Sequence, residues 1–336
     1  MKKRGLALLL VMAMVFTVFA GCGSAKEEKK VLRVAYFPNI THTQPLIMKE
    51  QKTLEKALGD WSVEWYDFNS GTSEMEAVFA EEIDIGYIGP VPAVSGNVKS
   101  DGDVKIISGS VNGGSMLVAK KGSNIKSISD LSGKTVAVPS IGNTQHLLLC
   151  DLMTANQLKA TTAGGDVNVK AVANGDTIAL MESGEIDAAF VPEPWGSTLV
   201  SQAGAEIVLD YDDIWNEEGT DGSKPGEYAT TVVIAREDFL DEHEDIVKIF
   251  MEQHKAATEY ITENQDEACG IVNKQIKELT GKELDTELLK SAFARIVPTV
   301  EIPKRSILKY QDAAKAETLI NRLSEEDDLF DESFLK

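Results

Sequence analysis

The sequence predicts an α/β protein with two equivalent lobes, each a mostly parallel sheet flanked by helices. The first observation is a repeated segment, Glu-Ile-Asp followed by four apolar or small residues and a proline-containing loop, at residues 82–90 and 185–193. The second is its context, because a helical stretch precedes each copy and each copy leads through a short apolar strand into a loop that can begin a helix. Loops at the carboxyl ends of parallel strands hold ligands in open α/β sheets, so the pair predicts one ligand between two lobes.

The first lobe is predicted from strand and helix patterns that alternate. The expected elements are strands at 31–36, 63–68 and 105–108 and helices at 44–58 and 73–81. This alternation is typical of a parallel sheet with helices on its faces.

The second lobe begins after the turn Asn112-Gly113-Gly114-Ser115, where the alternation starts again. The expected elements are strands at 116–119, 135–138 and 167–172 and helices at 143–153, 177–183 and 195–203. An acidic loop at 210–227 and a β-rich run at 230–235 follow, and the chain beyond residue 237 is almost wholly helical. We expect two crossings between the lobes, near residues 112 and 231, that act as a hinge. The predicted lobes are 31–114 with 232–336, and 115–231.

Two structural predictions concern buried side chains. The apolar face of a helix is formed by Ile246, Val247, Phe250, Met251, His254, Ala257, Thr258 and Ile261. We expect His254 to be a hydrogen-bonded core residue rather than a ligand. Cys150 and Cys269 fall on helices far apart in the chain, so we expect two buried thiols rather than a disulfide.

The N-terminal segment has the pattern of a secretory signal. Met1-Lys2-Lys3-Arg4 is basic and residues 5–20 carry no charge, a stretch that is short for a spanning helix. Phe19-Ala20-Gly21-Cys22 resembles the lipobox of bacterial lipoproteins, although Phe19 stands where an aliphatic residue is usual. We predict a signal peptide at 1–21, a lipidated Cys22, a tether at 22–30 and an extracytoplasmic protein anchored to the cell membrane. The alternative is an ordinary secreted protein.

Charge and motifs argue against several classes of function. The chain has 33 Lys and Arg against 54 Asp and Glu, and its net charge of −21 falls to −24 without Lys2, Lys3 and Arg4, which argues against nucleic acid. Residues 133–135 (Gly-Lys-Thr) lack the earlier glycine of a phosphate-binding loop. The sequence has no Gly-x-Ser-x-Gly and no His-Glu-x-x-His, and its histidines and cysteines lack metal-ligand spacing. We therefore expect neither an enzyme nor a bound cofactor or metal.

Acidic residues are missing where the two lobes should face each other. None occurs within residues 37–48, 87–99, 105–128 or 140–149, stretches that include the predicted strand-end loops. Neutral donors are present there instead, and the loop at 140–144 can offer backbone N–H groups at a helix N-terminus. The pattern predicts a pocket for an anion. The alternative is that turns and helix caps are simply rich in such residues.

Glu193, in Pro192-Glu193-Pro194-Trp195, is the acidic exception. It could receive an amino group of a ligand, but capping the helix that begins near Trp195 is the role we favour. An enzyme on this fold would need an acid/base pair in the cleft, for which only Glu193 and two loop histidines are available.

Several stretches of the chain match one family. They are residues 34–42 (Val-Ala-Tyr-Phe-Pro-Asn-Ile-Thr-His), Ser70-Gly71, 83–90, 127–138 and 184–195. Together they resemble the nitrate/sulfonate/taurine substrate-binding proteins of ABC importers, over essentially the whole mature chain. The resemblance implies a two-lobed periplasmic-binding-protein type II fold that closes by a hinge. It also implies a monomer that delivers a small molecule to a membrane permease driven by an ATPase.

The resemblance further implies a set of ligand contacts. They are Asn39, His42, Ser70, Gly71, Gly89 and Pro90 in the first lobe and Asn143, Thr144, Gln145, Glu193 and Trp195 in the second. We add Asn112 from the acid-free stretch 105–128. Taurine binders of this kind place an acid where the chain returns to the first lobe, where this sequence has Tyr228-Ala229-Thr230-Thr231, so taurine would need Glu193. No arginine lies in the predicted pocket loops, so neutral donors and helix dipoles would hold a sulfonate.

The leading hypothesis is the solute-binding component of an ABC importer, with an aliphatic sulfonate or similar small anion bound between the lobes. Within the same class, the alternative is an aminopyrimidine, thiamine-precursor-like or other aromatic solute stacked on Trp195. The alternative from another class is an enzyme on the same fold.

Overall fold

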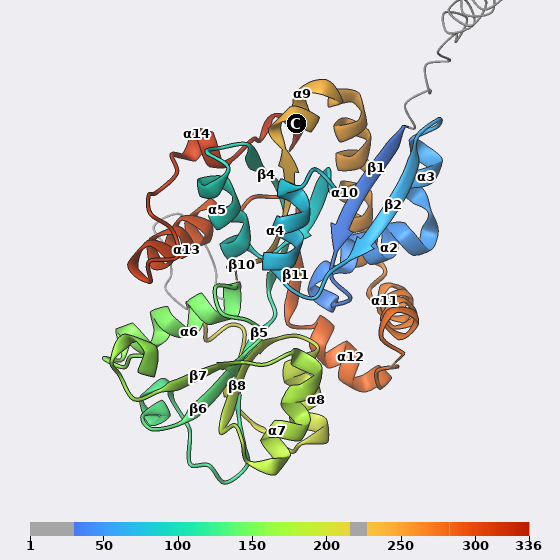
Figure 1. The fold of residues 1–336 in the computed structure, drawn as a ribbon. Helices are drawn as coiled ribbons and strands as arrows, with labels where there is room; N and C mark the ends of the chain where they lie inside the picture. The colour runs from blue at the N-terminus through green and yellow to red at the C-terminus, as the bar shows by residue number, and fades with distance from the viewer. Residues whose placement is uncertain (1–29, 216–226, 282, 336) are drawn as a thin grey trace, which may run out of the picture.

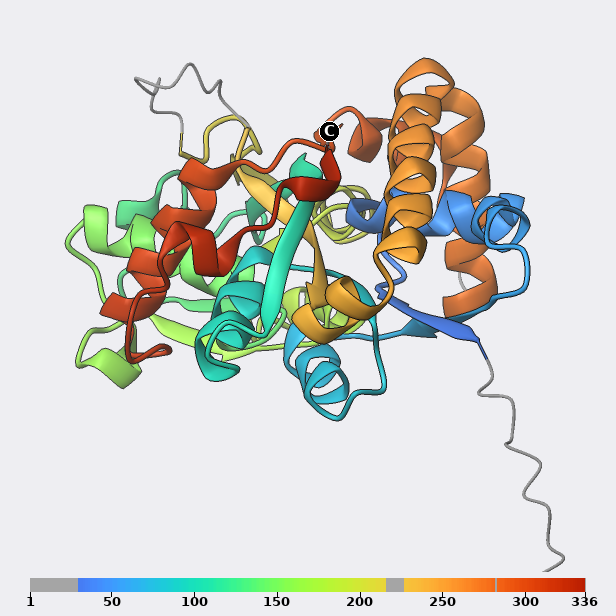
Figure 2. The ribbon, with the colours of Figure 1, turned by 90° about the horizontal axis from the view of Figure 1, so that it is seen from above.

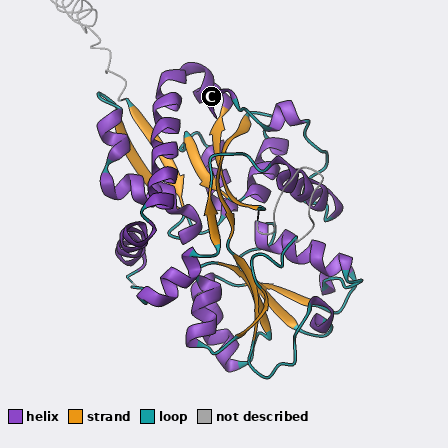
Figure 3. Ribbon diagram, turned by 180° about the vertical axis from the view of Figure 1, so that it is seen from behind, coloured by secondary structure: helices purple, strands orange, loops and turns teal. Residues whose placement is uncertain are grey.

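The computed structural model describes residues 30–215, 227–281 and 283–335. Figure 1 shows two lobes, each built around one β-sheet, and Figure 3 shows the two groups of strands from behind. The predicted signal peptide and Cys22 lie outside the described residues, as does most of the acidic loop at 210–227. In the part of the chain that is described, no helix is both long and apolar enough to cross a bilayer.

The first lobe contains a six-stranded mixed sheet with the order β11-β4-β10-β3-β1-β2. Its strands are β1 (Val31–Tyr36), β2 (Ser62–Asp67), β3 (Ile85–Ile88), β4 (Val104–Gly113), β10 (Ala229–Arg236) and β11 (Ile296–Pro298). β1 pairs in parallel with β2 and β3, whereas β10 runs antiparallel to β3 and β4. The predicted parallel arrangement therefore holds for the βα units, and the strands next to the lobe crossings add antiparallel pairs.

The second lobe repeats this arrangement in a five-stranded sheet with the order β7-β6-β8-β5-β9. Its strands are β5 (Ser115–Ala119), β6 (Thr135–Val138), β7 (Asn168–Ala171), β8 (Ala188–Pro192) and β9 (Glu206–Leu209). β6 pairs in parallel with β7 and β8, and β5 runs antiparallel to β8 and β9. The order β2-β1-β3-β10-β4 of the first lobe thus corresponds to β7-β6-β8-β5-β9, which confirms the two-lobed α/β fold.

Helices cover the sheets and connect the lobes. The α-helices are α2 (Thr43–Gln51), α3 (Thr53–Ala57), α4 (Gly71–Phe79), α5 (Pro90–Lys99), α6 (Thr144–Ala155), α7 (Thr177–Ser183), α8 (Trp195–Gln202), α9 (Glu237–Glu242), α10 (Glu244–Glu263), α11 (Gln265–Thr280), α12 (Thr286–Phe293), α13 (Lys304–Ala316) and α14 (Glu326–Leu329). Short 3-10 helices are η1 (Ile40–His42), η2 (Ile128–Leu131), η3 (Thr161–Ala163), η4 (Asn174–Asp176) and η5 (Ser333–Leu335). Figures 1 and 2 place α13 beside α5 and α6, at the end of the molecule opposite α10.

The helix predicted at 44–58 is wrong in one respect, because it is two helices. Lys52 ends α2 in the left-handed conformation, with a φ of 52°, and its N–H donates to the Met48 carbonyl. The chain changes direction there before α3 begins. A left-handed helix end is usually marked by glycine, so lysine gave no sequence signal.

The repeated segment has a structural role in each lobe. The Asp84 carboxylate accepts the Arg33 N–H over 2.8 Å, and the Asp187 carboxylate accepts the Thr135 N–H over the same distance. Arg33 lies in β1 and Thr135 in β6, the first parallel strand of each lobe. Each aspartate therefore ties the loop before the third strand to the first strand, which explains why Glu-Ile-Asp occurs twice.

The chain passes from the first sheet to the second through two glycines. Gly113 and Gly114 both have a φ of 71°, which side chains other than glycine rarely adopt. A Cβ atom on Gly114 would also lie 2.7 Å from Ile296. Tyr228 holds the crossing on both sides, since its carbonyl accepts the Gly113 N–H and its hydroxyl accepts the Ser115 N–H. The predicted return near residue 231 lies inside β10, and the domain bounds and the hinge stay predictions.

The buried side chains follow the sequence pattern. The eight residues predicted on the apolar face of α10 are its buried residues. His254 bonds to the Tyr87 hydroxyl over 2.8 Å and to the Gly109 carbonyl over 3.0 Å, so it is a core residue as predicted. Cys150 and Cys269 are free and buried, which confirms the two thiols. One apolar cluster includes Leu148 of the second lobe and Val94 of the first, with Tyr310 of α13 between α5 and α6.

Candidate functional site

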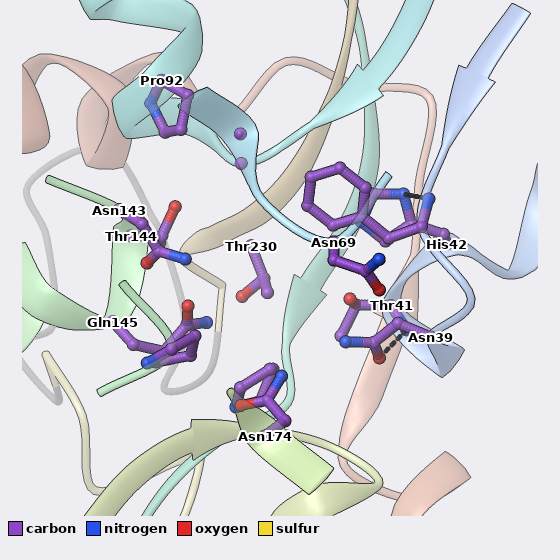
Figure 4. Close-up of a pocket in the computed structure, with 15 residues that line it drawn as sticks. Asn39, Thr41, His42, Asn69, Pro92, Asn143, Thr144, Gln145, Asn174 and Thr230 are labelled. Atoms are coloured by element: carbon purple, nitrogen blue, oxygen red, sulfur yellow. Dashed lines mark hydrogen bonds between the residues drawn. The ribbon is translucent and has the colours of Figure 1, made fainter. Parts of the chain in front are cut away.

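A pocket lies between the lobes at the carboxyl ends of the parallel strands. It holds about 460 Å³, its opening to solvent included. The first lobe contributes Phe37, Asn39, Thr41, His42, Asn69, Gly71, Gly89, Pro92 and Thr230, and the second contributes Pro139, Asn143, Thr144, Gln145, Asn174 and Pro192. Figure 4 shows Asn143, Thr144 and Gln145 facing Asn39, Thr41 and Asn69 across it. Among the described residues that line the pocket, none is charged.

Four helices begin at the pocket wall. His42 lies directly before α2, Gly71 is the first residue of α4, Gly89 directly precedes α5, and Thr144 is the first residue of α6. A helix N-terminus carries a partial positive charge and unpaired backbone N–H groups. These helix ends therefore bring partial positive charge to a pocket whose described lining carries no formal charge.

Three of the four helices, α2, α5 and α6, begin without a side-chain cap. Proline, which has no N–H group, occurs in the first turn of α2 and α5 but not in that of α6. No side chain caps α6, although Asn143 is at the capping position. The Asn143 Oδ1 and Thr144 Oγ1 atoms are buried and have no hydrogen-bond partner among the described residues. In α4, by contrast, the Ser70 hydroxyl accepts the Ser73 N–H. Of α4 and α6, therefore, α6 is the helix whose first-turn N–H groups are left to bind a ligand.

His42 offers a neutral donor. Its Nδ1 atom accepts the Phe37 N–H over 3.2 Å, and its ring stacks on Phe37 with centroids 4.6 Å apart. Burial lowers the pKa of His42 to about 3, so the ring is neutral at physiological pH and its hydrogen is on Nε2. An Nε2–H group can donate to an anion without bringing a charge into the pocket.

The two lobes touch at the pocket rim. A Cβ atom built on Gly89 of the first lobe would lie 2.5 Å from the Thr144 hydroxyl of the second. Real Cβ atoms do not approach that closely, so this contact requires glycine at position 89.

The structure brings together seven of the residues predicted to bind ligand. Asn39, His42, Gly71, Gly89, Asn143, Thr144 and Gln145 line the pocket. Three others do not line it: Ser70 caps α4, Pro90 begins α5, and Asn112 is buried in β4, where its Oδ1 atom has no partner among the described residues. A binding role for these three stays a prediction.

Glu193 and Trp195 do not line the pocket. The Glu193 carboxylate accepts the Ser197 N–H over 2.8 Å and the Ser197 hydroxyl over 2.6 Å, the contacts of the capping role. Trp195 begins α8 and packs on the apolar core of the second lobe. Its ring would lie 3.8 Å from a Cβ atom on Gly175, so it supports the loop beside the pocket rather than the pocket wall.

Four polar lining residues lie outside the predicted contacts: Thr41, within the matched stretch 34–42, and Asn69, Asn174 and Thr230. Asn174 had a sequence signal, because it lies 103 residues after Gly71, the same offset that relates the repeated segments. Its Oδ1 atom is buried and has no partner among the described residues. Thr230 donates its hydroxyl hydrogen to the Gly113 carbonyl at the lobe crossing, a contact that only the fold brings together. Within the described ranges, no group of three or more His, Cys, Asp or Glu side chains could hold a metal ion.

Comparison with known sequences gives a consistent result. Residues 25–273 match the model of the NMT1-like family. The chain is 25% identical over 339 residues to the "Putative aliphatic sulfonates-binding protein" of Bacillus subtilis (strain 168), covering 98% of this chain and 95% of that one. It is 28% identical over 192 residues to the taurine-binding periplasmic protein of Escherichia coli (strain K12), covering 56% of this chain and 54% of that one.

Solved structures share the fold. The periplasmic aliphatic sulphonate binding protein of Escherichia coli superimposes with a TM-score of 0.72 at 19% identity, over 90% of this chain and 92% of that one. The alkanesulfonate-binding protein of Xanthomonas axonopodis pv. citri, bound to MOPS, superimposes with a TM-score of 0.69 at 17% identity, over 88% and 95%. At these identities the likeness establishes the architecture and not the ligand.

Proposed function

Since the chain belongs to the NMT1-like family, we propose that it is the solute-binding component of an ABC importer and that its ligand is an aliphatic sulfonate. The relatives named above are binding proteins for sulfonates and taurine, which supports the solute-binding role and argues against an enzyme. The solute would pass from this protein to a permease driven by an ATPase.

The uncapped N-terminus of α6 is the observation that best supports an anionic ligand. Its first-turn N–H groups, the Thr144 hydroxyl and the neutral His42 ring are donors around one pocket. A sulfonate has three oxygens to accept such bonds and one negative charge for the helix dipoles to stabilise. No carboxylate among the described lining residues opposes it.

The proposed location is outside the cytoplasm, at the cell membrane. The basic and apolar N-terminal segment and the lipobox-like residues before Cys22 support a lipid anchor there. Incorporation of a labelled fatty acid into the wild-type chain and not into Cys22→Ser tests this part of the proposal.

The ligand is tested by calorimetry with a matched pair of solutes. Ethanesulfonate and ethanesulfonamide have nearly the same shape, but only the first is an anion at pH 7. We expect ethanesulfonate to bind and the sulfonamide to bind at least tenfold more weakly, because helix dipoles discriminate by charge. Thr144→Val keeps the side-chain shape and should weaken ethanesulfonate about tenfold by removing a donor to a charged group. Thr154→Val, at an exposed position of the same helix, is the control and should leave binding unchanged.

A result of equal affinity for both solutes would reject the anion assignment. If ethanesulfonate, nitrate and bicarbonate all fail to bind and an aminopyrimidine binds, the ligand is an uncharged aromatic solute instead. Turnover of any of these compounds would overturn the transport role.

A further inference from the structure

Arg295 joins the two lobes through two carboxylates. It directly precedes β11 of the first sheet. Its Nε atom lies 2.7 Å from Asp210, which follows β9, and its Nη1 atom lies 3.5 Å from Glu193, which follows β8. Both acids belong to the second sheet's side of the molecule. The Arg295 side chain is only 17% exposed, so this contact is largely sheltered from solvent.

Both carboxylate oxygens of Glu193 are hydrogen-bonded, and the carboxylate also pairs with Arg295. Its side chain is 0% exposed although it directly follows Pro192, which lines the pocket. Both oxygens accept hydrogen bonds from Ser197, and Arg295 supplies the opposite charge. Burial raises the pKa of Glu193, while the Ser197 hydrogen bonds and the Arg295 charge oppose that rise. The acidic side chain next to the pocket in sequence is therefore held away from it.

This arrangement has a consequence for the charge of the solute. An ammonium group taken out of water needs an opposite charge or several acceptors to offset its lost hydration. Among the described lining residues there is no carboxylate, and the acid next to the pocket is occupied by Arg295. A sulfonate that also carries an amino group would thus lose hydration without a counter-charge.

We propose that Arg295 is a positioning residue that sets the charge selectivity of the pocket. By pairing with Glu193 and Asp210 it offsets one of the two negative charges there and holds the Glu193 carboxylate away from the pocket, so the site takes a sulfonate without an amino group in preference to a zwitterionic one. This rests on the proposed function and narrows it.

The test compares ethanesulfonate with taurine, which differs from it by one amino group. Dissociation constants are measured by calorimetry for the wild type, Arg295→Gln, Arg295→Lys and the double variant Glu193→Gln/Arg295→Gln. We expect the wild type to bind ethanesulfonate at least tenfold more tightly than taurine. Arg295→Gln should shrink that ratio about tenfold, because the Glu193 charge is then uncompensated. Arg295→Lys keeps the positive charge, and the double variant removes the charges of Arg295 and Glu193 together while Asp210 stays, so both should restore the ratio.

The ratio separates selectivity from a general structural role. Loss of structure would weaken both solutes by the same factor and leave the ratio unchanged, a result that would overturn the inference. So would a wild type that binds taurine as tightly as ethanesulfonate, and this measurement decides even if Arg295→Gln fails to fold. If the wild type binds neither solute, the proposed function itself fails.

Discussion

The two lobes carry the same short motif at the pocket and use it differently. Asn39 and His42 in the first lobe correspond to Asn143 and His146 in the second, at an offset of 104 residues. Both histidines accept a backbone N–H at Nδ1 over 3.2 Å, from Phe37 and from Gly142. The asparagines differ. Asn39 accepts the Thr41 N–H and closes its own turn, whereas the Asn143 side chain caps nothing.

The histidines differ as well. His42 faces the pocket, while the Nε2 atom of His146 lies 3.6 Å from the Cys150 sulfur inside the second lobe. The first lobe therefore presents a loop whose asparagine side chain is already hydrogen-bonded, with the His42 Nε2–H group as its donor to the solute. The other presents a helix end whose bonds are left for the solute. The comparison shows that equivalent residues in a duplicated fold need not have equivalent roles.

The two lobes also differ at two further pairs of equivalent positions. Glu74 in α4 corresponds to Thr177 in α7, and Gly86 in β3 to Ala189 in β8, at an offset of 103. Thr177 donates its hydroxyl hydrogen to the Asn174 carbonyl over 2.6 Å. Glu74 is fully buried, and neither of its carboxyl oxygens has a partner among the described residues. A Cβ atom on Gly86 would lie 2.3 Å from that carboxyl group, so the glycine leaves it room.

Closing the open helix end should have the largest effect. In Asn143→Asp a carboxylate caps α6 and also faces the anion, so the affinity for ethanesulfonate should fall about a hundredfold while the helix keeps its stability. Asn39→Asp should cost less, because that side chain already caps η1. Calorimetry on both variants measures the difference. Asn321→Asp, at an exposed position, controls for an added charge. Equal losses at 39 and 143 would contradict the assignment of the open end to the second lobe.

Replacing Glu74 with the neutral Gln should increase the free energy of unfolding at high pH. Burial raises the pKa of Glu74 well above its ordinary value of 4.5. The pKa of Glu74 is higher in the folded protein than in the unfolded chain. The contribution of Glu74 to the free energy of unfolding is therefore fully present below pH 4.5 and is lost as the pH rises through the folded-state pKa. Glu74→Gln should therefore match the wild type near pH 4 and exceed it by about 1–2 kcal/mol at pH 8. Urea unfolding at several pH values measures this.

The control for that substitution is Glu76→Gln, at an exposed position of the same helix. It should leave the pH dependence of the free energy of unfolding unchanged. A Glu74→Gln variant that is less stable than the wild type at pH 8 would show that the carboxylate has a stabilising partner, and the contrast with Thr177 would be lost.

The contact between the lobes should affect affinity less than the N-terminus of α6 does. Gly89→Ala places a methyl group against the Thr144 hydroxyl, so the lobes must separate slightly and ethanesulfonate affinity should fall about tenfold. Adding Thr144→Ala removes the clashing atom, so the double variant should bind no more weakly than Thr144→Ala alone. Gly270→Ala, in α11 with open space around it, is the matched control. Fully additive losses would mean that the lobes do not meet at this point in the bound protein.

The sequence predicted the features that depend on local pattern. Strand and helix alternation located the lobes, because it depends on neighbouring residues. Three of the four acid-free stretches, 37–48, 87–99 and 140–149, contain residues that line the pocket, whereas 105–128 contains none. The break at Lys52 was missed since a left-handed lysine has no compositional signal. The environment of Glu193 was missed for another reason. Its partner Arg295 is 102 residues away in the chain, and only the packing of α12 on α8 brings the two together.

The apolar cluster that runs through both lobes affects how cooperatively the protein unfolds. Side chains of α5, α6 and α13 share it, although each lobe also has a smaller apolar cluster of its own. Separate cores permit separate melting, whereas a shared one couples the loss of either half to the other. A solute that bridges the lobes therefore protects the whole chain from unfolding, including helices that it never touches.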